Sequence, residues 1–283
     1  MVHTEYLQIN NHVLFTKKIG SGDPVLFLHG GPGLFHDYLV QPFKQLSSNH
    51  ELIFFDQRGS GASSALNPNK PICINDFVAD IEALRQALNF STFTLIGHSW
   101  GGLLAVLYAA KFGKNLKSMI LVDPAPGNSS FDKVGRNTMQ NRLTVDDREE
   151  INSIMQTNPF ENREMDAINR FVQINEKPRY FDQSYVSKNK PTFTFDTLTK
   201  LQIVSSLLNE ELDDYDIYQR IQGLDTKTLV IHGDYDPIPV KSSRKYSEMT
   251  SNSRFLLLKD CGHFPFIEKK EETLSSIVNF LNP

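Results

Sequence analysis

The 283-residue sequence contains only two cysteines, Cys73 and Cys261. Two thiols in a chain of this length cannot build the disulfide framework that stabilises small secreted domains. We therefore expect both thiols to be free. Cys261 lies two residues before His263, which suggests a thiol nucleophile as an alternative, but a side chain so near in sequence is badly placed to attack independently.

The sequence also lacks long apolar segments and an excess of positive charge. Its first fifteen residues have neither the basic start nor the apolar stretch of a secretory signal, and no segment approaches the length of a membrane span. Lys and Arg number 29 against 33 Asp and Glu, a formal net charge of -4, so no basic face is available for nucleic acid or an anionic membrane. These absences predict a cytoplasmic protein without nucleic-acid or membrane partners.

What is present is the composition of a chain with one sizeable core, at 40% hydrophobic and 22% charged residues. Residues 5–20 alternate around the turn-prone pair Asn10-Asn11 and predict an antiparallel hairpin at a sheet edge. Short apolar runs typical of buried strands then recur at 25–28, 52–55, 93–96, 119–122, 228–231 and 255–258.

Segments with helical periodicity alternate with these strands. The three-and-four spacing of apolar residues predicts helices over 37–46, 75–88 and 101–112, one between the last two strands, and a final one over 271–281. Nearly all-apolar strands that alternate with helices indicate a parallel sheet covered on both faces. The sequence therefore predicts the α/β class, with a mostly parallel, doubly wound sheet.

This alternation stops between residues 127 and 218. The segment is polar and helix-prone, and it lacks short β-branched runs. Thr144 followed by Asp147 has the form of a capping box, and 163–172 has helical periodicity. We predict a core domain made of 1–126 and 219–283, with a mainly helical cap over 127–218.

The strand at 93–96 leads into Gly97-His98-Ser99-Trp100-Gly101 and then into a predicted helix. A Gly-x-Ser-x-Gly motif between a strand and a helix is the setting of a nucleophile elbow, in which a strained backbone exposes the serine hydroxyl. Glycines on both sides permit the close approach of neighbouring chains. A chance pentapeptide is the alternative, and the flanking elements favour Ser99 as a nucleophile.

Acyl transfer also needs donors for the oxyanion. His29-Gly30-Gly31-Pro32-Gly33 follows an earlier strand, where such a loop belongs. We predict that the backbone N–H groups of Gly31 and Trp100 form the oxyanion hole. His29 fits a structural loop role better than that of a base, and the glycines have the alternative of a simple tight turn.

A serine hydroxyl needs a base, and the base needs a carboxylate to orient it. In the order serine, acid, histidine, the late segments offer Asp234 and Asp236 after one strand and His263 after the next. We predict His263 as the base and favour Asp236 as the acid because it lies further into its loop. Asp260 is expected to be a capping or turn residue, and His232 to be buried and hydrogen-bonded.

No cofactor or metal is predicted. Asp56-Gln57-Arg58-Gly59 lacks the glycine spacing of a dinucleotide site and a Walker lysine, so Asp56 and Arg58 are expected to form a loop-bracing ion pair. No histidine and carboxylate cluster has the spacing of helical metal ligands.

Together, His29-Gly-Gly-Pro-Gly33, Asp56-Gln-Arg-Gly59 and Gly97-x-Ser99-Trp100-Gly-Gly102 resemble the proline iminopeptidase family of α/β hydrolases. Gly233-Asp-Tyr-Asp236 and Gly262-His263 resemble that family's acid and base segments, which supports Asp236 over Asp234. The resemblance implies the α/β-hydrolase fold and an aminopeptidase that releases N-terminal proline from small peptides through an acyl-enzyme.

The family holds the substrate amine with glutamates, at least one of them from the cap. By location the candidates here are Glu161, Glu164, Glu210 and Glu211, each with the alternative of a solvated charge; Glu210 and Gly30 are the predicted substrate contacts. Five aromatic residues of the cap are expected either to line an apolar pocket or to pack in its core: Phe160, Phe171, Tyr180, Phe181 and Tyr185.

Two other functions remain open. Gly-His-Ser-x-Gly is common in esterases and lipases, so hydrolysis of small carboxylic esters or amides is the first alternative. The second is a non-catalytic hydrolase-fold protein that binds a small ligand, which the presence of all three triad residues disfavours.

Overall fold

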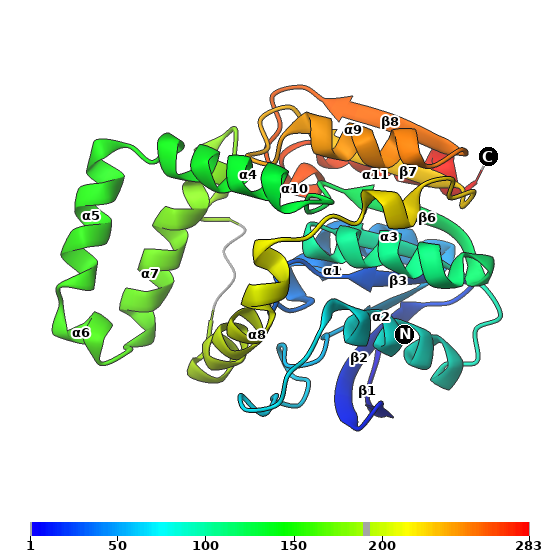
Figure 1. Cartoon of the computed structure of the whole chain (residues 1–283), viewed down its shortest axis with the longest axis horizontal. Helices are drawn as coiled ribbons and strands as arrows, with labels where there is room; N and C mark the ends of the chain where they lie inside the picture. Colours follow the sequence, from blue (N-terminus) through cyan, green and yellow to red (C-terminus); the bar gives the residue numbers. More distant parts are fainter. Residues whose placement is uncertain (1, 189–192, 283) are drawn as a thin grey trace.

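The computed structural model describes residues 2–188 and 193–282. Within them, one sheet has the strand order β1-β2-β4-β3-β5-β6-β7-β8 (Figure 1). β2 pairs antiparallel with β1 and β4, and the other pairs are parallel, as predicted. The strands are β1 (Val2–Ile9), β2 (His12–Gly20), β3 (Asp23–Leu28), β4 (His50–Phe55), β5 (Phe93–His98), β6 (Leu116–Val122), β7 (Thr228–Gly233) and β8 (Ser253–Leu258).

The predicted N-terminal hairpin is confirmed and forms one edge of the sheet. Its turn consists of Asn10 and Asn11, both with positive φ (45° and 64°). Asparagine tolerates this left-handed conformation, and two such residues match the twist of the strands they join. The Asn10 amide also donates to the Asp80 carboxylate at 2.9 Å, which fixes the turn against the next layer.

Two apolar layers cover the sheet because successive strand residues point to opposite faces. Leu26 and Leu28 of β3 belong to one layer, and Val25 and Phe27 to the other. The first layer contains α2 (Ile74–Ala87), α3 (Trp100–Phe112) and part of α9 (Val240–Met249). The second contains α1 (Asp37–Phe43), α10 (Pro265–Glu268) and α11 (Lys270–Leu281). The doubly wound α/β arrangement predicted from the sequence is therefore present.

The helix predicted over 37–46 is shorter than expected. α1 ends at Phe43, and a 3-10 turn, η1, continues over Lys44–Ser48. Pro42 lies inside α1 and has no N–H to donate to the preceding turn. That missing bond would reach the turn before Pro42, and beyond Phe43 the chain keeps its helical direction in the tighter 3-10 form of η1.

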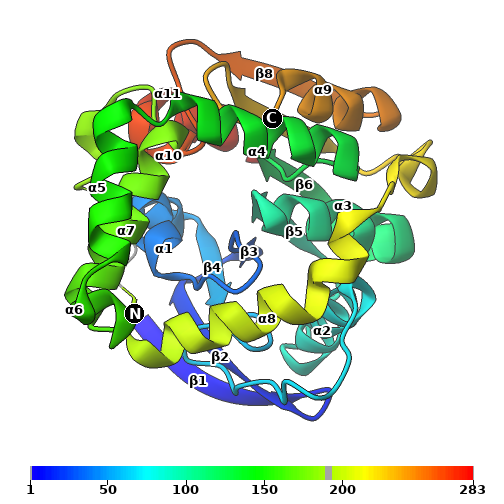
Figure 2. The same ribbon diagram turned by 60° about the vertical axis from the view of Figure 1, so that its left-hand side comes forward.

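Between β6 and β7 the chain forms a helical insertion, which Figures 1 and 2 show beyond the carboxyl ends of the strands. The capping box of Thr144 and Asp147 is confirmed, and the helix expected over 163–172 extends to Glu176. The division at residues 127 and 218 remains a prediction. The elements are α4 (Ser129–Arg142), α5 (Val145–Met155), α6 (Asn158–Glu161), α7 (Met165–Glu176), η3 (Lys177–Arg179), η4 (Gln183–Tyr185), α8 (Phe195–Asp213) and η5 (Tyr218–Ile221).

Among the described residues, no helix is both long enough and apolar enough to cross a bilayer.

Candidate active site

Ser99 occupies the sharp turn between β5 and α3, as predicted. Its backbone has φ 53° and ψ -120°, a conformation that non-glycine residues rarely adopt. Hydrogen bonds on both sides hold it there: its N–H donates to Val122 O at 3.1 Å, and its carbonyl accepts from Gly102 N and Ala125 N, both at 2.8 Å. The surrounding structure thus maintains a strained residue at the mouth of a cavity.

The two glycines of the motif are required for steric reasons. A Cβ at Gly97 would lie 2.3 Å from Gly101 O, and one at Gly101 would lie 2.2 Å from Leu28 O. These atoms belong to the backbone and cannot move aside. The turn is therefore possible only because β3, β5 and α3 approach one another at residues without side chains.

His263 and Asp236 meet beyond the ends of β8 and β7. His263 Nδ1 lies 2.7 Å from Asp236 Oδ2, and both side chains are buried. The other Asp236 oxygen accepts from Ile238 N at 2.8 Å. Burial alone would raise the pKa of Asp236, but the charge and hydrogen bond of His263 hold it below its ordinary value. An ionised Asp236 fixes the His263 proton on Nδ1 and leaves Nε2 as an acceptor.

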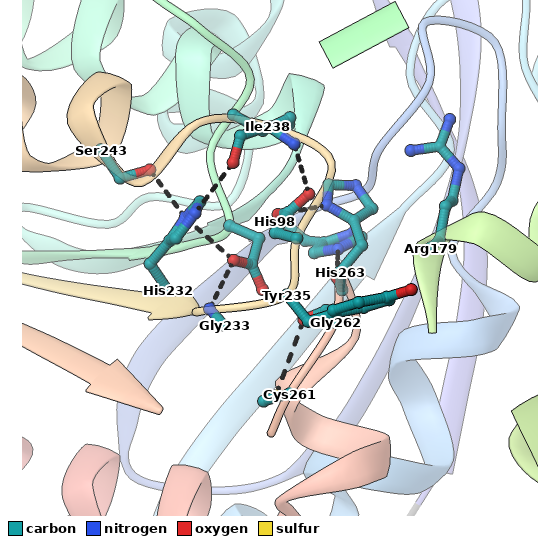
Figure 3. Close-up of polar contacts among 12 residues, drawn as sticks. His98, Arg179, His232, Gly233, Tyr235, Ile238, Ser243, Cys261, Gly262 and His263 are labelled. Atoms are coloured by element: carbon teal, nitrogen blue, oxygen red, sulfur yellow. Dashed lines mark hydrogen bonds and ion pairs between the residues drawn. The ribbon is translucent and has the colours of Figure 1, made fainter. Parts of the chain in front are cut away.

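A second buried pair, Asp123 and His232, lies close to this one, and Figure 3 shows His232 with its partners Ser243 and Ile238. His232 Nε2 donates to Ile238 O at 3.1 Å, and burial lowers the pKa of the ring, which favours the neutral form. Nδ1 is therefore an acceptor; it lies 2.9 Å from the Ser243 hydroxyl and 3.0 Å from Asp123 Oδ1. Burial and the neighbouring Asp236 charge raise the pKa of Asp123. The two neighbouring carboxyl groups are therefore shifted in opposite directions, with the charged form favoured at Asp236 and disfavoured at Asp123. The expectation of a buried, hydrogen-bonded His232 is confirmed.

A chain of three hydrogen bonds joins the glycine loop after β3 to the histidine loop after β8. Gly30 N–H donates to the Tyr38 hydroxyl at 2.7 Å, which must then donate its only proton to His98 Nδ1 at 2.8 Å. The single N–H proton of the His98 ring is then on Nε2, which donates to His263 O at 2.9 Å. Burial lowers the pKa of His98, which keeps the ring neutral as this pattern requires.

The glycine loop is supported from its other side by buried polar groups. His29 Nε2 accepts from Gln57 N at 3.0 Å, and Gln57 Nε2 donates to His29 O at 2.9 Å, which agrees with a structural role for His29. Gln57 Oε1 accepts the indole N–H of Trp100 at 2.9 Å. Gly31 lines the cavity, and the backbone N–H of Trp100 lies at the first position of α3, where the helix provides no acceptor.

The predicted ion pair between Asp56 and Arg58 is wrong. Arg58 forms a two-pronged pair with Asp80 of α2, with both N–O distances at 2.7 Å, and Asp56 instead accepts from the backbone and ring of His36. The side chains of Asp56 and Arg58 point in different directions from this tight loop, so each pairs with a residue elsewhere in the chain. Both interactions still brace the loop, and neither group faces the cavity.

A cavity of about 300 Å³ lies between the sheet and the helical insertion. Ser99, His263, Gly30 and Gly31 line one side, and most other walls are apolar. The remaining lining residues are Pro32, Leu34, Tyr38, His98, Val172, Glu176, Arg179, Phe193, Leu198, Leu201, Ser205 and Phe264.

The charged residues of this lining are Glu176 and Arg179, which the sequence analysis missed. They form an ion pair, with Arg179 Nε 3.0 Å from Glu176 Oε1. Burial opposes the charge of Arg179, but Glu176 and Asp236 keep its pKa above the ordinary value. The available signal was Glu176-Lys-Pro-Arg179, where a proline follows the end of an amphipathic helix.

The predicted glutamate contacts of the insertion are not in the cavity. Glu161, Glu164 and Glu210 are exposed, and Glu211 accepts from Ile74 N at the start of α2. Glu210 was chosen by its place in the sequence, but it lies on the solvent face of α8. Glu210 is not among the described residues that line the cavity, whereas Gly30 is, and the role of each as a substrate contact stays a prediction.

The described cavity lining includes none of the five aromatic residues named from the sequence. Phe160 packs against Phe171, and Phe181 is exposed and lies edge-on to Tyr235. Tyr180 stacks on Phe264, which does line the cavity. These contacts agree better with the second alternative, in which the aromatic residues pack within the insertion or between the insertion and the core.

Other reactive side chains near His263 have structural surroundings. Cys261 is buried, and burial raises the pKa of its thiol, which disfavours the nucleophilic thiolate. Asp260 has φ 50° in a turn, as expected. Asp123, His232 and Asp236 bring possible ligand atoms within 4.8 Å of one another; Gly233 N donates to Asp123 Oδ1 at 2.9 Å, and Asp236 contacts His263.

Comparison with known proteins identifies the family. The family model described as alpha/beta hydrolase fold matches residues 23–270, so the chain belongs to that family. Among curated proteins it is 27% identical over 269 residues to a proline iminopeptidase of Heyndrickxia coagulans, covering 93% of this chain and 92% of that protein. A proline iminopeptidase of Chitinophaga pinensis is 26% identical, with 95% and 93% covered. The resemblance given by the core motifs is thus confirmed.

Solved structures have the same fold. A proline iminopeptidase from Mycobacterium smegmatis superposes with a TM-score of 0.72 at 19% identity, covering 99% of this chain and 97% of that one. A thermophilic esterase from Thermogutta terrifontis gives a TM-score of 0.73 at 21% identity, with 99% and 98% covered. Peptidases and esterases therefore both occur among proteins of this shape, so the fold alone does not select the substrate.

Proposed function

We propose that the protein is a serine hydrolase with Ser99 as nucleophile, His263 as general base and Asp236 as the orienting acid. The observation that carries the proposal is the 2.7 Å contact from His263 to Asp236, with Ser99 in a strained turn on the same cavity. Serine hydroxyls react at neutral pH only with such a base, and the base needs an acid that fixes its tautomer.

In the proposed reaction, Ser99 Oγ attacks the substrate carbonyl and its proton passes to His263 Nε2. The backbone N–H groups of Gly31 and Trp100 stabilise the oxyanion of the tetrahedral intermediate. His263 then gives the proton to the leaving group, and the acyl-enzyme forms. Water attacks this ester after losing a proton to His263, which releases the acid product and restores Ser99.

The specific activity that we propose is release of an N-terminal residue, with proline preferred, from small peptides. The curated relatives named above are proline iminopeptidases. Among the described lining residues, Glu176 supplies a carboxylate that would receive the substrate ammonium group, while apolar walls such as Leu198 and Phe193 would surround a pyrrolidine ring. Ion pairing in a partly desolvated site is strong enough to select for a free amine.

Hydrolysis of small esters is the second candidate, and one observation favours it. Arg179 already neutralises Glu176 at 3.0 Å, so the carboxylate attracts an ammonium group less than an unpaired one would. Together with the mostly apolar lining, this pair would admit an uncharged acyl group. The two candidates share the triad and differ only in the role of Glu176.

Glu176→Gln separates the two candidates. Cleavage of proline p-nitroanilide should fall about 10- to 100-fold in kcat/KM, because a charged hydrogen bond contributes about 1.5–3 kcal/mol. Cleavage of p-nitrophenyl acetate should stay unchanged. Glu210→Gln, at an exposed position, is the matched control, and Ser99→Ala reports the background of each assay.

Wild-type protein that hydrolyses the ester but never the arylamide would contradict the aminopeptidase proposal. The same conclusion would follow if Glu176→Gln and Glu210→Gln cleaved the arylamide equally well. Strict dependence on a free α-amine would instead dismiss the esterase.

A further inference from the structure

The turn of the insertion that carries Glu176 and Arg179 is bonded directly to the loop that carries His263. Arg179 O accepts the backbone N–H of His263 at 2.7 Å. The approach is close enough that a Cβ at Gly262 would lie 2.0 Å from the same oxygen. Figure 3 shows the Arg179 side chain on one side of His263, and both residues line the cavity. The charged wall of the cavity and the proposed base therefore share one backbone contact.

Glu268 completes the connection from the far side of the histidine loop. Its Oε1 accepts from Gly262 N at 2.8 Å. Its Oε2 accepts from Phe181 N at 2.9 Å and Asp182 N at 3.0 Å, in the chain that follows the turn. One carboxylate thus holds the residue before His263 with one oxygen and the insertion with the other.

These are strong contacts for a side chain outside the cavity. Hydrogen bonds from backbone N–H groups to a carboxylate are roughly twice as strong as neutral ones. Burial raises the pKa of Glu268, and the three backbone N–H donors oppose that shift by stabilising the charged form. Removing the carboxylate would leave three N–H groups without their acceptor.

The acid loop is attached to the same region. Arg142 of α4 donates to Pro178 O at 3.1 Å and to Tyr235 O at 2.6 Å, next to Asp236. Tyr235 N in turn donates to Cys261 O at 2.8 Å, which joins the acid and histidine loops (Figure 3). The insertion therefore contacts the backbone on both sides of the His263–Asp236 pair.

We propose that Glu268 is a positioning residue that fixes His263 by joining the histidine loop to the insertion turn at Arg179–Asp182. This inference rests on the proposed function, since it assigns His263 as the base. In this arrangement the insertion is part of the framework that sets the direction of His263 Nε2. Glu268 contacts no reacting atom and acts through the backbone of residues 262 and 263.

The test is the rate at which a fluorophosphonate probe in excess labels Ser99. The rate constant reports how well His263 activates the hydroxyl, whereas the final amplitude reports the folded fraction. Glu268→Gln keeps the shape of the side chain but replaces one acceptor oxygen with an amide donor. Since a displacement of about 1 Å in a catalytic group costs about 10²-fold, we expect the rate constant to fall about 10- to 100-fold at unchanged amplitude. Glu271→Gln, at an exposed site of α11, should label like wild type.

A second pair of variants probes the insertion end of the contact and remains informative if Glu268→Gln fails to fold. Asp182→Pro removes the N–H that donates to Glu268, and Asp182→Ala removes the same side chain but keeps that N–H. We expect Asp182→Pro to label severalfold more slowly than Asp182→Ala. Equal rate constants for Glu268→Gln and wild type, or for the two Asp182 variants, would overturn the inference. Wild type that is not labelled at Ser99 would instead contradict the proposed function.

Discussion

At the scale of single residues, the site depends on the protonation of Asp236, Asp123 and His98, which burial and neighbouring groups control. Asp236 stays ionised because His263 lies 2.7 Å away, and His98 stays neutral because it is buried. Asp123 is pushed towards its neutral form by burial and by Asp236. These opposite pKa shifts favour the negative charge on Asp236, the carboxyl group that contacts the proposed base.

Asp236→Asn should lower kcat/KM by about 10⁴-fold for every substrate that the protein turns over. The amide can present an N–H to His263 Nδ1, which would hold the imidazole in the tautomer that cannot accept the Ser99 proton. Assays with the best substrate, beside a melting curve, would measure this. Activity within tenfold of wild type would show that Asp236 is not the acid, and Asp234→Asn provides the comparison at the other candidate position.

At the scale of elements, polar contacts between helices supplement the apolar layers. Glu82 of α2 accepts from Arg85 in its own helix, from the Tyr108 hydroxyl of α3 at 2.7 Å and from Asn115 at 3.2 Å. The hydrogen bond and charge of Arg85, with Tyr108 and Gln86, lower the pKa of Glu82 from 4.5 to about 2. This carboxylate joins α2, α3 and Asn115, which precedes β6, most strongly when it is ionised.

Because folding lowers the pKa of Glu82, its contribution to the free energy of unfolding is complete above pH 4.5 and is lost as the pH falls towards about 2. Glu82→Gln should lower the free energy of unfolding at pH 7 by about 1 kcal/mol, a modest value because solvent screens the group. The difference from wild type should shrink between pH 5 and pH 3. Urea unfolding at several pH values measures it, with exposed Glu248→Gln as control; a pH-independent difference would contradict this account.

Elements were predictable from the sequence where the cause was local. The Asn10-Asn11 hairpin, the elbow at Ser99 and the capping box at Thr144 each depend on a few neighbouring residues, and all three are present. The end of α1 was misplaced because the apolar periodicity does not distinguish an α-helical turn from the 3-10 turn of η1 that follows it. The hydrophobic pattern of a segment predicts its own secondary structure well, but it says little about which elements contact one another.

At the scale of the whole molecule, the contacts that sequence patterns missed join distant segments. Arg58 pairs with Asp80, 22 residues away, in place of its neighbour Asp56. Glu176 reaches the cavity because it ends α7, directly before the turn whose Arg179 contacts the histidine loop, whereas Glu210 is exposed on α8. No local periodicity encodes that path of the chain. The triad candidates escaped this difficulty because the order of strands in the sheet already brings their loops to one edge.

The central claim is that Ser99 is a nucleophile activated by His263. The most direct measurement is fluorophosphonate labelling of wild type and His263→Ala, followed by mass spectrometry of the peptide that contains residue 99. The account predicts one label per wild-type chain, attached to Ser99, and a loss of labelling in His263→Ala while the variant remains folded. A label on another residue, an unlabelled wild type, or equal labelling of the two proteins would contradict it.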